Sequence, residues 1–392
     1  MIKKLILCLI IGVSLLWFFM PKSAHRLITV QFASWGSESE INILKPILKD
    51  FENKNPNIKV DFMHIPQNYF QKIHLLFASN TAPDVIFINN QYLPIYANAG
   101  VLEELKDFDF ASYYPQAVDA LSWKGKNYGI PRDISNLVIF YNKDIFDKYK
   151  VKYPHENWTF EEFLQTAIKI THRPKVFGVS FDETPLYYIP YMTSFGGWMQ
   201  KDIDDFFKKD VLNYKANKSG IEFYSNLRNK YHVAPYRQES GSATMGQMFL
   251  QEKLGMYLSG RWMVPKLRTD AKFDWDVIEF PKVNDNSTIP LDASGWVISK
   301  SSKHKKEAKL LIEFLSNEQN SEKFAKSGLI VPANIEASKS KAFLDNQKPK
   351  NAKIFLSIIE TSVPTPKSVR YNKIIDAIKK KSEYLFTPQP NP

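Results

Sequence analysis

Residues 27–32 read Leu-Ile-Thr-Val-Gln-Phe, residues 58–62 read Ile-Lys-Val-Asp-Phe, and residues 85–88 read Val-Ile-Phe-Ile. Such runs, rich in β-branched and aromatic residues, predict strands. Between them, apolar residues recur at helical spacing over residues 41–53 and over residues 68–79, which predicts two amphipathic helices. Strand, helix, strand, helix, strand is a βαβαβ unit, so this region predicts an α/β fold with a mainly parallel sheet covered by helices.

The rest of the chain continues this alternation. Its strand-like runs are at residues 137–141, 254–258, 276–280 and 295–299, and its helical patterns are at residues 158–170, 245–251 and 304–315. Thr159 followed three residues later by Glu162 is the pattern of a capping box, which predicts that a helix begins there. At about 100–200 residues per domain, the length of 392 residues indicates two domains.

Composition and charge narrow the class of protein. The chain is 44% hydrophobic and 24% charged, which excludes a disordered or fibrous protein. Its net charge of +11 comes from lysines and arginines interspersed with acids, with a dense run at residues 379–381 near the C-terminus, so nucleic-acid binding is not supported. The single cysteine, Cys8, excludes a disulfide framework, an iron–sulfur cluster and a multi-cysteine zinc site. We therefore expect neither a metal nor a cofactor.

The motifs of common enzyme classes are missing. Gly255 and Gly260 have the spacing of a phosphate-binding loop, but Arg261 and Trp262 follow in place of the lysine and hydroxyl residue that hold phosphate and magnesium. The His-Glu-x-x-His zinc motif and the Gly-x-Ser-x-Gly nucleophile elbow are also absent. Because the two carboxylates of a glycosidase come from separate elements without a fixed spacing, an exported glycoside hydrolase stays open as an alternative class.

The first 24 residues have the pattern of a secretory signal peptide. Lys3 and Lys4 precede an apolar run of about 16 residues from Leu5 to Met20, and Ala24 offers a cleavage position. The run is shorter than the roughly 20 residues that cross a bilayer, which favours a signal peptide. Lys22 stands where a small residue is preferred before cleavage, so an uncleaved N-terminal anchor is the alternative. Both alternatives predict export to the periplasm or the cell surface.

A series of short motifs resembles the extracellular solute-binding proteins of sugar-type ABC importers, the maltose-binding-protein-like family. They are, in the family's order, Phe51-Glu-Asn-Lys-Asn-Pro-Asn-Ile-Lys-Val60, Thr81-Ala-Pro-Asp-Val85, Tyr96-Ala-Asn-Ala-Gly100, Gly125-Lys-Asn-Tyr-Gly-Ile-Pro131, Tyr141-Asn-Lys-Asp144, Asn157-Trp-Thr-Phe-Glu-Glu-Phe163, Gly260-Arg-Trp262 and Gly295-Trp-Val-Ile-Ser299. Each motif is weak alone. Their shared order, from about residue 28 to the last helices, carries the resemblance.

The resemblance implies a two-lobed periplasmic-binding-protein fold of type II, with two mainly parallel-sheet domains joined by a hinge of several segments. After the N-terminal segment 1–24, the first lobe would comprise residues 25–136 and 291–334, and the second residues 137–290 and 335–392. It also implies a monomeric binding protein, not an enzyme. Such a protein captures a sugar or small oligosaccharide between its lobes and delivers it to the permease subunits of an ABC transporter. A phosphorylated polyol such as glycerol 3-phosphate is the alternative ligand.

Aromatic side chains are candidates for the cleft because a sugar presents apolar C–H faces to flat rings. Trp35 follows the C-terminal end of the first predicted strand, where ligands bind in open α/β sheets. The other candidates, by resemblance, are Trp198 with Gly197, Trp262, and Trp296 with Gly295. For each tryptophan, ordinary core packing is the alternative role.

Polar side chains are the candidates for contacting the hydroxyl groups of the ligand. Asn90 and Gln91 follow the third predicted strand, where relatives place a carboxylate or an amide, and the acid is missing here. Glu38 lies in the loop after Trp35, and its alternative role is a charge that favours the start of a helix. Asp133 resembles a hinge-side position that some relatives use for ligand, and a solvated loop charge is its alternative.

Two arginines are candidates that matter most for the phosphorylated alternative. Arg370 resembles a C-terminal arginine that contacts ligand in some members of the family, and Arg261 precedes the candidate Trp262. Either guanidinium could hold a phosphate as a bidentate fork. A surface charge is the alternative role for Arg370.

Overall fold

The computed structural model describes residues 27–197, 215–284, 288–345 and 347–387. The expected signal segment, residues 1–24, and the candidate Trp198 lie outside the described residues. None of the described helices has the length and apolar character needed to cross a membrane.

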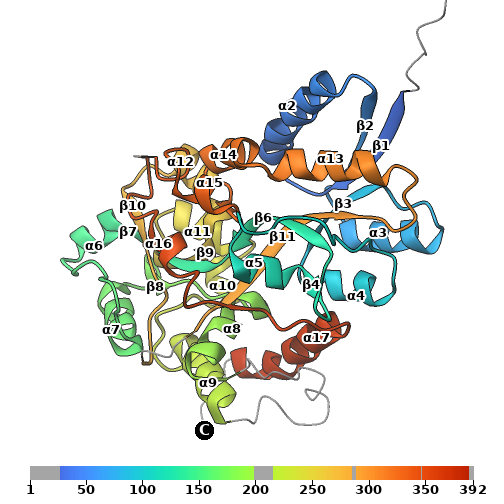
Figure 1. Cartoon of the computed structure of the whole chain (residues 1–392). Helices are drawn as coiled ribbons and strands as arrows, with labels where there is room; N and C mark the ends of the chain where they lie inside the picture. Colours follow the sequence, from blue (N-terminus) through green and yellow to red (C-terminus); the bar gives the residue numbers. More distant parts are fainter. Residues whose placement is uncertain (1–26, 198–214, 285–287, 346, 388–392) are drawn as a thin grey trace, which may run out of the picture.

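The described strands form two main sheets and a small hairpin (Figure 1). The seven strands of the first sheet are β1 (Ile28–Ser34), β2 (Ile58–His64), β3 (Val85–Asn89), β6 (Gly129–Ser135), β11 (Pro290–Ile298), β12 (Val331–Pro332) and β13 (Val363–Pro364). The four strands of the second sheet are β7 (Leu137–Asn142), β8 (Phe177–Val179), β9 (Leu254–Gly260) and β10 (Trp275–Ile278). The hairpin pairs β4 (Ser122–Trp123) with β5 (Lys126–Asn127).

Helices cover both sheets. Those that pack with the first sheet or follow its strands are α2 (Glu38–Lys54), α3 (Tyr69–Ala78), α4 (Leu93–Asn98), α5 (Pro115–Ala120), α13 (Lys305–Ser316), α14 (Glu318–Lys326) and α15 (Ile335–Lys339). The remaining helices are α6 (Lys143–Lys148), α7 (Phe160–Ile170), α8 (Pro185–Ser194), α9 (Lys215–Asn229), α10 (Arg237–Ser240), α11 (Met245–Leu250), α12 (Val264–Asp270), α16 (Ile354–Ser357) and α17 (Tyr371–Ser382), with the 3-10 turns η3 (Arg261–Met263) and η4 (Glu383–Phe386). Figure 1 shows α2 and α13 at one end of the molecule and α7 and α9 at the other.

The first sheet contains the predicted βαβαβ unit. β1 pairs in parallel with β2, with Ile28 opposite Ile58, and with β3, with Phe32 opposite Val85. Later in the chain, β11 is antiparallel to β3 and β6, and β12 is antiparallel to β6, whereas β11 pairs in parallel with β13. In the second sheet β7 is antiparallel to β9 and β10, whereas β8 is parallel to β9. Both sheets are therefore mixed. Parallel pairing does not extend through them as expected, because β11 returns from the second sheet in the opposite direction to β3.

Capping residues fix the starts of two helices that the sequence predicts. The Ser37 hydroxyl accepts a hydrogen bond of 3.3 Å from the Glu40 N–H at the start of α2. At the start of α7, the Thr159 hydroxyl accepts from the Glu162 N–H, and the Glu162 carboxylate accepts from the Thr159 N–H. This confirms the predicted capping box, which satisfies amide donors that the first helical turn leaves unpaired.

The chain crosses between the two sheets at several points. β6 ends at Ser135 and β7 begins at Leu137, and the chain returns between Ile278 of β10 and Pro290 of β11. The bounds implied by the resemblance, residues 136–137 and 290–291, lie next to these strand ends.

The third expected boundary, residue 334, lies at the N-cap of α15. α15 packs against β12 and α14 of the first lobe. The chain reaches the second lobe at Phe343, whose ring centroid lies 3.9 Å from the Arg261 guanidinium carbon. β13 then pairs with β11 before α17 packs on α8, so the C-terminal part contacts both lobes.

Candidate functional site

A pocket of about 240 Å³ lies where the two lobes meet. The first lobe contributes Gln91 after β3, Ser135 at the end of β6, and Pro290 and Asp292 of β11. The hinge and the second lobe contribute Leu137, Thr184, Pro185, Leu186, Ile189, Pro190, Trp262, Thr365, Tyr371, Asn372 and Ile375. A ligand in this pocket therefore contacts both lobes.

Trp262, a candidate for the cleft, forms an aromatic wall of the pocket. β9 ends at Gly260, and the 3-10 turn η3 follows directly, so Trp262 stands beyond the edge of the second sheet. A side-chain carbon on Gly260 would lie 2.0 Å from the Trp262 ring, so the ring packs against backbone that only glycine leaves uncovered. The residue is 36% exposed, and its ring can stack on an apolar ligand face.

Helix α8 supplies most of the remaining apolar surface. It starts with Pro185 at its first position, where the lack of an N–H costs no hydrogen bond because that N–H would have no partner within the helix. Leu186 is exposed, and Ile189 and Pro190 also line the pocket. Together with Trp262 they make the second-lobe side of the pocket apolar.

Asp292 supplies the carboxylate that the sequence analysis found missing after β3. The pairing of Ser294 with Asn89 places β11 beside β3. Asp292 then accepts hydrogen bonds from the Asn90 amide, at 2.9 Å, and from the Gln91 amide, at 3.1 Å. Burial raises the pKa of Asp292 above its usual range, against the opposing effect of hydrogen bonds from Thr365 and the two amides. Asn90 is itself buried and bonds the Ala293 backbone, so it holds Asp292 in place, whereas Gln91 reaches the pocket.

Tyr371, not Arg370, is the pocket residue at the start of α17. Tyr371 is buried and lines the pocket, and burial raises the pKa of its hydroxyl well above the usual range, with the charge of Asp292 adding to this. Arg370 is exposed at the N-cap position of α17 and is not among the lining residues. The expected ligand role of Arg370 is not supported, because the helix turns its neighbour toward the cleft.

Trp35 and Glu38 lie beside the first sheet and outside this pocket. Trp35 follows β1 and is half-buried, and its ring centroid lies 4.2 Å from that of Phe87 and 4.9 Å from that of Tyr69. Glu38 is exposed in the first turn of α2, where a negative charge favours the helix. In this conformation Trp35 shows the packing role, and Glu38 the helix-start role, that the sequence analysis gave as alternatives.

Asp133 is a buried ion-pair partner and does not reach the ligand pocket. Its carboxylate lies 2.5 Å from the Arg132 guanidinium, which also pairs with Glu40. Burial raises the pKa of Asp133 although Arg132 opposes the shift. The Arg132 guanidinium carbon lies 4.1 Å from the Phe87 ring centroid, so this cluster links β6, α2 and β3. In this structure Asp133 thus lies in a buried ion pair, outside the pocket and not in a solvated loop.

Gly295 and Trp296 belong to the interior of the first sheet. β11 is paired on both edges, with β3 and with β6. A side-chain carbon on Gly295 would lie 2.1 Å from the Ile130 carbonyl oxygen, and Trp296 is 0% exposed. Neither residue lines the pocket, and both show the core packing that was the alternative role.

Gly197 also serves packing. A side-chain carbon there would lie 1.9 Å from the Asn217 side-chain oxygen, so the glycine allows the chain to pass close to α9. It is not among the residues that line the pocket.

Arg261 points away from the pocket into the second lobe. It is 3% exposed, and its guanidinium carbon lies 3.9 Å from the Phe343 ring centroid and 5.3 Å from that of Phe355. Burial, with the charge of Arg268 adding to it, lowers the pKa of Arg261 to about 9. The expected phosphate-holding role is not supported, because the turn at η3 sends Arg261 and Trp262 in different directions.

The residues that the structure describes include no group of three or more His, Cys, Asp or Glu side chains that could hold a metal ion. The side chains that line the pocket offer hydrogen bonding through Gln91 and Asp292 and apolar contact through Trp262.

Comparisons with known proteins agree with this arrangement. A family model described as bacterial extracellular solute-binding protein matches residues 47–351. The galactooligosaccharide-binding protein of Bacillus subtilis is 24% identical over 362 residues, which cover 87% of this chain and 80% of that protein. The maltodextrin-binding protein MdxE of Bacillus subtilis is 23% identical over 342 residues, covering 82% of this chain and 77% of that protein.

A solved structure extends the likeness to the fold. An ABC substrate-binding protein from Listeria monocytogenes, in complex with cycloalternan, is 28% identical, with a TM-score of 0.81 over 92% of this chain and 93% of that one. Its two-lobed architecture is the one described above. Because the family model spans well over half of the chain, this protein belongs to the bacterial extracellular solute-binding protein family.

Proposed function

We propose that this chain captures a neutral sugar or small oligosaccharide between its lobes and delivers it to the permease of an ABC importer. The observation that carries this proposal is the composition of the inter-lobe pocket. It combines the exposed ring of Trp262 with the Asp292 carboxylate and the Gln91 amide, and the described residues that line it include no lysine or arginine.

This combination matches the chemistry of a sugar. The C–H faces of a pyranose ring stack on an aromatic side chain, while the hydroxyl groups around its rim donate to carboxylates and bond amides. Asp292 is already held by Asn90 and Gln91, so its remaining acceptor capacity faces the pocket without rearrangement. Relatives named for galactooligosaccharide and maltodextrin binding, and the neighbour solved with cycloalternan, support the same class of ligand.

A phosphorylated polyol is disfavoured by the same pocket. A phosphate needs cationic or N–H donors, and the two arginines considered for this role, Arg261 and Arg370, do not line the pocket. The charge of Asp292 would repel the phosphate.

Two lobes joined by several crossing segments suit capture by closure. A ligand that contacts both lobes makes its full set of contacts only in the closed state and therefore shifts the population toward it. The family is extracellular, so capture takes place outside the cytoplasm, and the closed form would dock on the permease as a monomer. The segment 1–24 would direct export and either be removed or stay as an anchor.

The experiment that tests this function is thermal unfolding in the presence of a panel of sugars, oligosaccharides and polyol phosphates. A ligand at about 100 times its Kd stabilises the native state by about 2.7 kcal/mol, which is readily seen as a shift in Tm. A shift with a sugar and none with a phosphate is the expected result. A shift with polyol phosphates alone would overturn the neutral-sugar proposal, and turnover of a glycoside would favour the exported hydrolase.

A further inference from the structure

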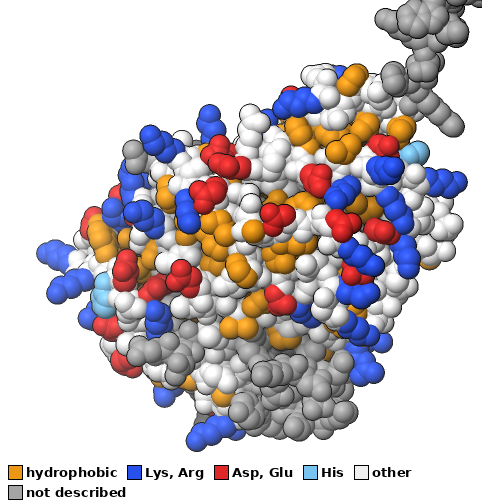
Figure 2. All heavy atoms as spheres, in the orientation of Figure 1, with side chains coloured by type: hydrophobic (Ala, Val, Ile, Leu, Met, Phe, Trp, Pro, Cys, Tyr) orange, Lys and Arg blue, Asp and Glu red, His pale blue; other side chains and the backbone are white. Residues whose placement is uncertain are grey.

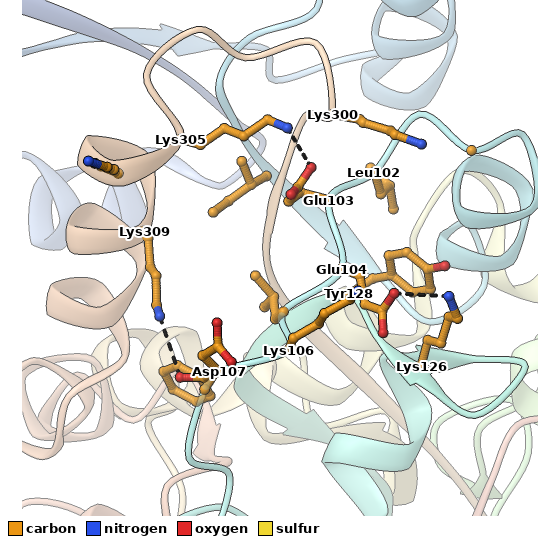
Figure 3. Close-up of a pocket in the computed structure, with 15 residues that line it drawn as sticks. Leu102, Glu103, Glu104, Lys106, Asp107, Lys126, Tyr128, Lys300, Lys305 and Lys309 are labelled. Atoms are coloured by element: carbon orange, nitrogen blue, oxygen red, sulfur yellow. Dashed lines mark hydrogen bonds and ion pairs between the residues drawn. The ribbon is translucent and has the colours of Figure 1, made fainter.

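A second hollow, of about 550 Å³, lies on the first lobe away from the inter-lobe pocket. It is bounded by the segment after α4, the β5 edge of the hairpin, the end of β11 and the start of α13 (Figure 3). Its floor is apolar, with Leu102, Leu105 and Ile298, and its rim is charged. We call it the basic hollow because six lysines line it: Lys106, Lys126, Lys300, Lys305, Lys306 and Lys309.

The lysines of the basic hollow outnumber its acids. The three acids that line it are Glu103, Glu104 and Asp107. Two of them form ion pairs with lysines of the hollow: Glu103 with Lys305 at 2.7 Å and Glu104 with Lys126 at 3.0 Å. Figure 3 marks both pairs with dashed lines. Of the other four lysines, Lys309 lies 3.8 Å from the Glu313 carboxylate. Among the described residues, no ion pair within 4.0 Å involves Lys106, Lys300 or Lys306. Positive charge is therefore left over at the rim.

The excess comes largely from one short stretch of sequence. Residues 300–309 read Lys-Ser-Ser-Lys-His-Lys-Lys-Glu-Ala-Lys, with one acid, Glu307. Lys305 and Lys306 occupy the first turn of α13, where the helix dipole disfavours positive charge. Lys305 is accounted for by its ion pair with Glu103. Local helix stability does not explain Lys306, so we look for its role outside the fold.

The position of the basic hollow relates it to the start of the chain. Val85 lies opposite Ile298 at the end of β11 and opposite Phe32 in β1. β1 begins at Ile28, so the first residue of β1 and the last residue of β11 lie at the same end of the strands of the first sheet. Gln91 and the inter-lobe pocket lie at the opposite end of these strands. Figure 2 shows Lys and Arg side chains gathered with several acids on this side of the first lobe.

We propose that the basic hollow docks the first lobe on the anionic phospholipid headgroups of the membrane surface. This rests on the exported location in the proposed function and not on the identity of the ligand. The apolar run of residues 5–20 is joined to the fold at this edge, so a membrane-held N-terminus brings the basic hollow to the headgroups. The inter-lobe pocket then faces away from the membrane and can take up solute, and the first lobe would leave the headgroups before the closed form docks on the permease.

The chemistry of the rim favours a membrane over a small bound anion. Lysines are strongly hydrated point charges on flexible stems, suited to diffuse attraction, whereas tight recognition of one phosphate uses the rigid fork of arginine. The described lining holds six lysines and no arginine. Each lysine near an anionic surface contributes about fivefold to membrane binding.

The test measures binding of the full-length chain to vesicles of phosphatidylcholine with increasing fractions of phosphatidylglycerol. The apolar segment is present in every sample, so the ratio of binding with and without phosphatidylglycerol isolates the charge effect. The variant Lys106→Gln/Lys300→Gln/Lys306→Gln should lower this ratio at least about tenfold, since three lysines are removed. Raising the salt concentration should lower the wild-type ratio in the same way.

The matched control is Lys379→Gln/Lys380→Gln/Lys381→Gln at the end of α17, which removes the same charge from the second lobe. It should keep the wild-type ratio. An equal loss in both variants, or no dependence on phosphatidylglycerol, would overturn the proposal. So would competition by soluble glycerol phosphate at millimolar concentration, which would make the hollow a small-molecule site. The Tm shift with sugar is measured on the same variants, so a failure of the ligand proposal is seen separately.

Discussion

The inter-lobe pocket and the basic hollow differ in size and, more importantly, in chemistry. The hollow is larger, at about 550 Å³ against about 240 Å³. It lies within one lobe and is rimmed by lysines, whereas the pocket is lined by both lobes and pairs an aromatic wall with a carboxylate and an amide. By volume alone, the hollow would be taken as the ligand site. The pocket is favoured instead because it is lined by both lobes and its side chains match a neutral polyol.

The strongest test of this distinction is the substitution Asp292→Asn. Hydrogen bonds to charged groups contribute about 1.5–3 kcal/mol, so sugar affinity should fall by about tenfold to a hundredfold, measured by isothermal titration calorimetry. Glu103→Gln, which changes a carboxylate of the basic hollow in the same way, is the control and should leave sugar affinity unchanged. If the two variants bind sugar equally well, Asp292 is not a ligand contact.

A second test removes an aromatic ring from each cavity. Trp262→Ala should weaken sugar binding by more than roughly tenfold, because a buried aromatic contact is lost, whereas Tyr128→Ala in the basic hollow should have no effect on it. Both affinities are measured by the quenching or enhancement of tryptophan fluorescence, with calorimetry for Trp262→Ala. Unchanged affinity in Trp262→Ala would remove this ring from the site.

The two tryptophans that follow glycines show what the sequence could and could not predict. Gly260-Arg-Trp262 and Gly295-Trp296 look alike in sequence, and both were placed in the cleft. Trp262 follows the last residue of a strand, whereas Trp296 lies inside β11 with a paired strand on either side. Burial of this kind depends on strand order, which a single sequence does not reveal.

Asp292 was missed for a related reason. Its partners Asn90 and Gln91 are about 200 residues earlier in the chain, and only the pairing of β11 with β3 brings them together. Local features were predicted well: the βαβαβ unit and the capping box at Thr159 both follow from short-range patterns. Antiparallel returns and side-chain partners across the hinge are long-range, and there the predictions were incomplete.

A third test uses pH. The fold raises the pKa of Asp292 above the ordinary value of 3.8, chiefly through burial, so the fold favours the protonated carboxyl and its stabilising effect is lost as pH rises through the folded pKa. The carboxylate needed for sugar hydroxyls is therefore present above that pKa. Sugar affinity should fall as the pH drops through it, by no more than the loss seen in Asp292→Asn.

The measurement is calorimetric affinity against pH for the wild type and for Asp292→Asn. The variant lacks the titrating group, so its affinity should show no step in the acid range. A step of equal size in both proteins would assign the pH dependence to another group, and Asp292 would then not be the acceptor.

The smallest expected effect concerns stability at the basic hollow. Lys306 lies in the first turn of α13, where an acid is favoured by the helix dipole by about 0.3–1 kcal/mol. Lys306→Glu should therefore raise the free energy of unfolding by about this amount, measured by urea denaturation at low salt. Lys379→Glu, the same change in the last turn of α17, should lower it by a similar amount, because a cation is favoured there. If Lys306→Glu instead destabilises the protein, the lysine serves the fold. The stabilising outcome would mean that the first lobe keeps a charge its own helix disfavours, as expected for a residue whose role lies in contact with an anionic surface.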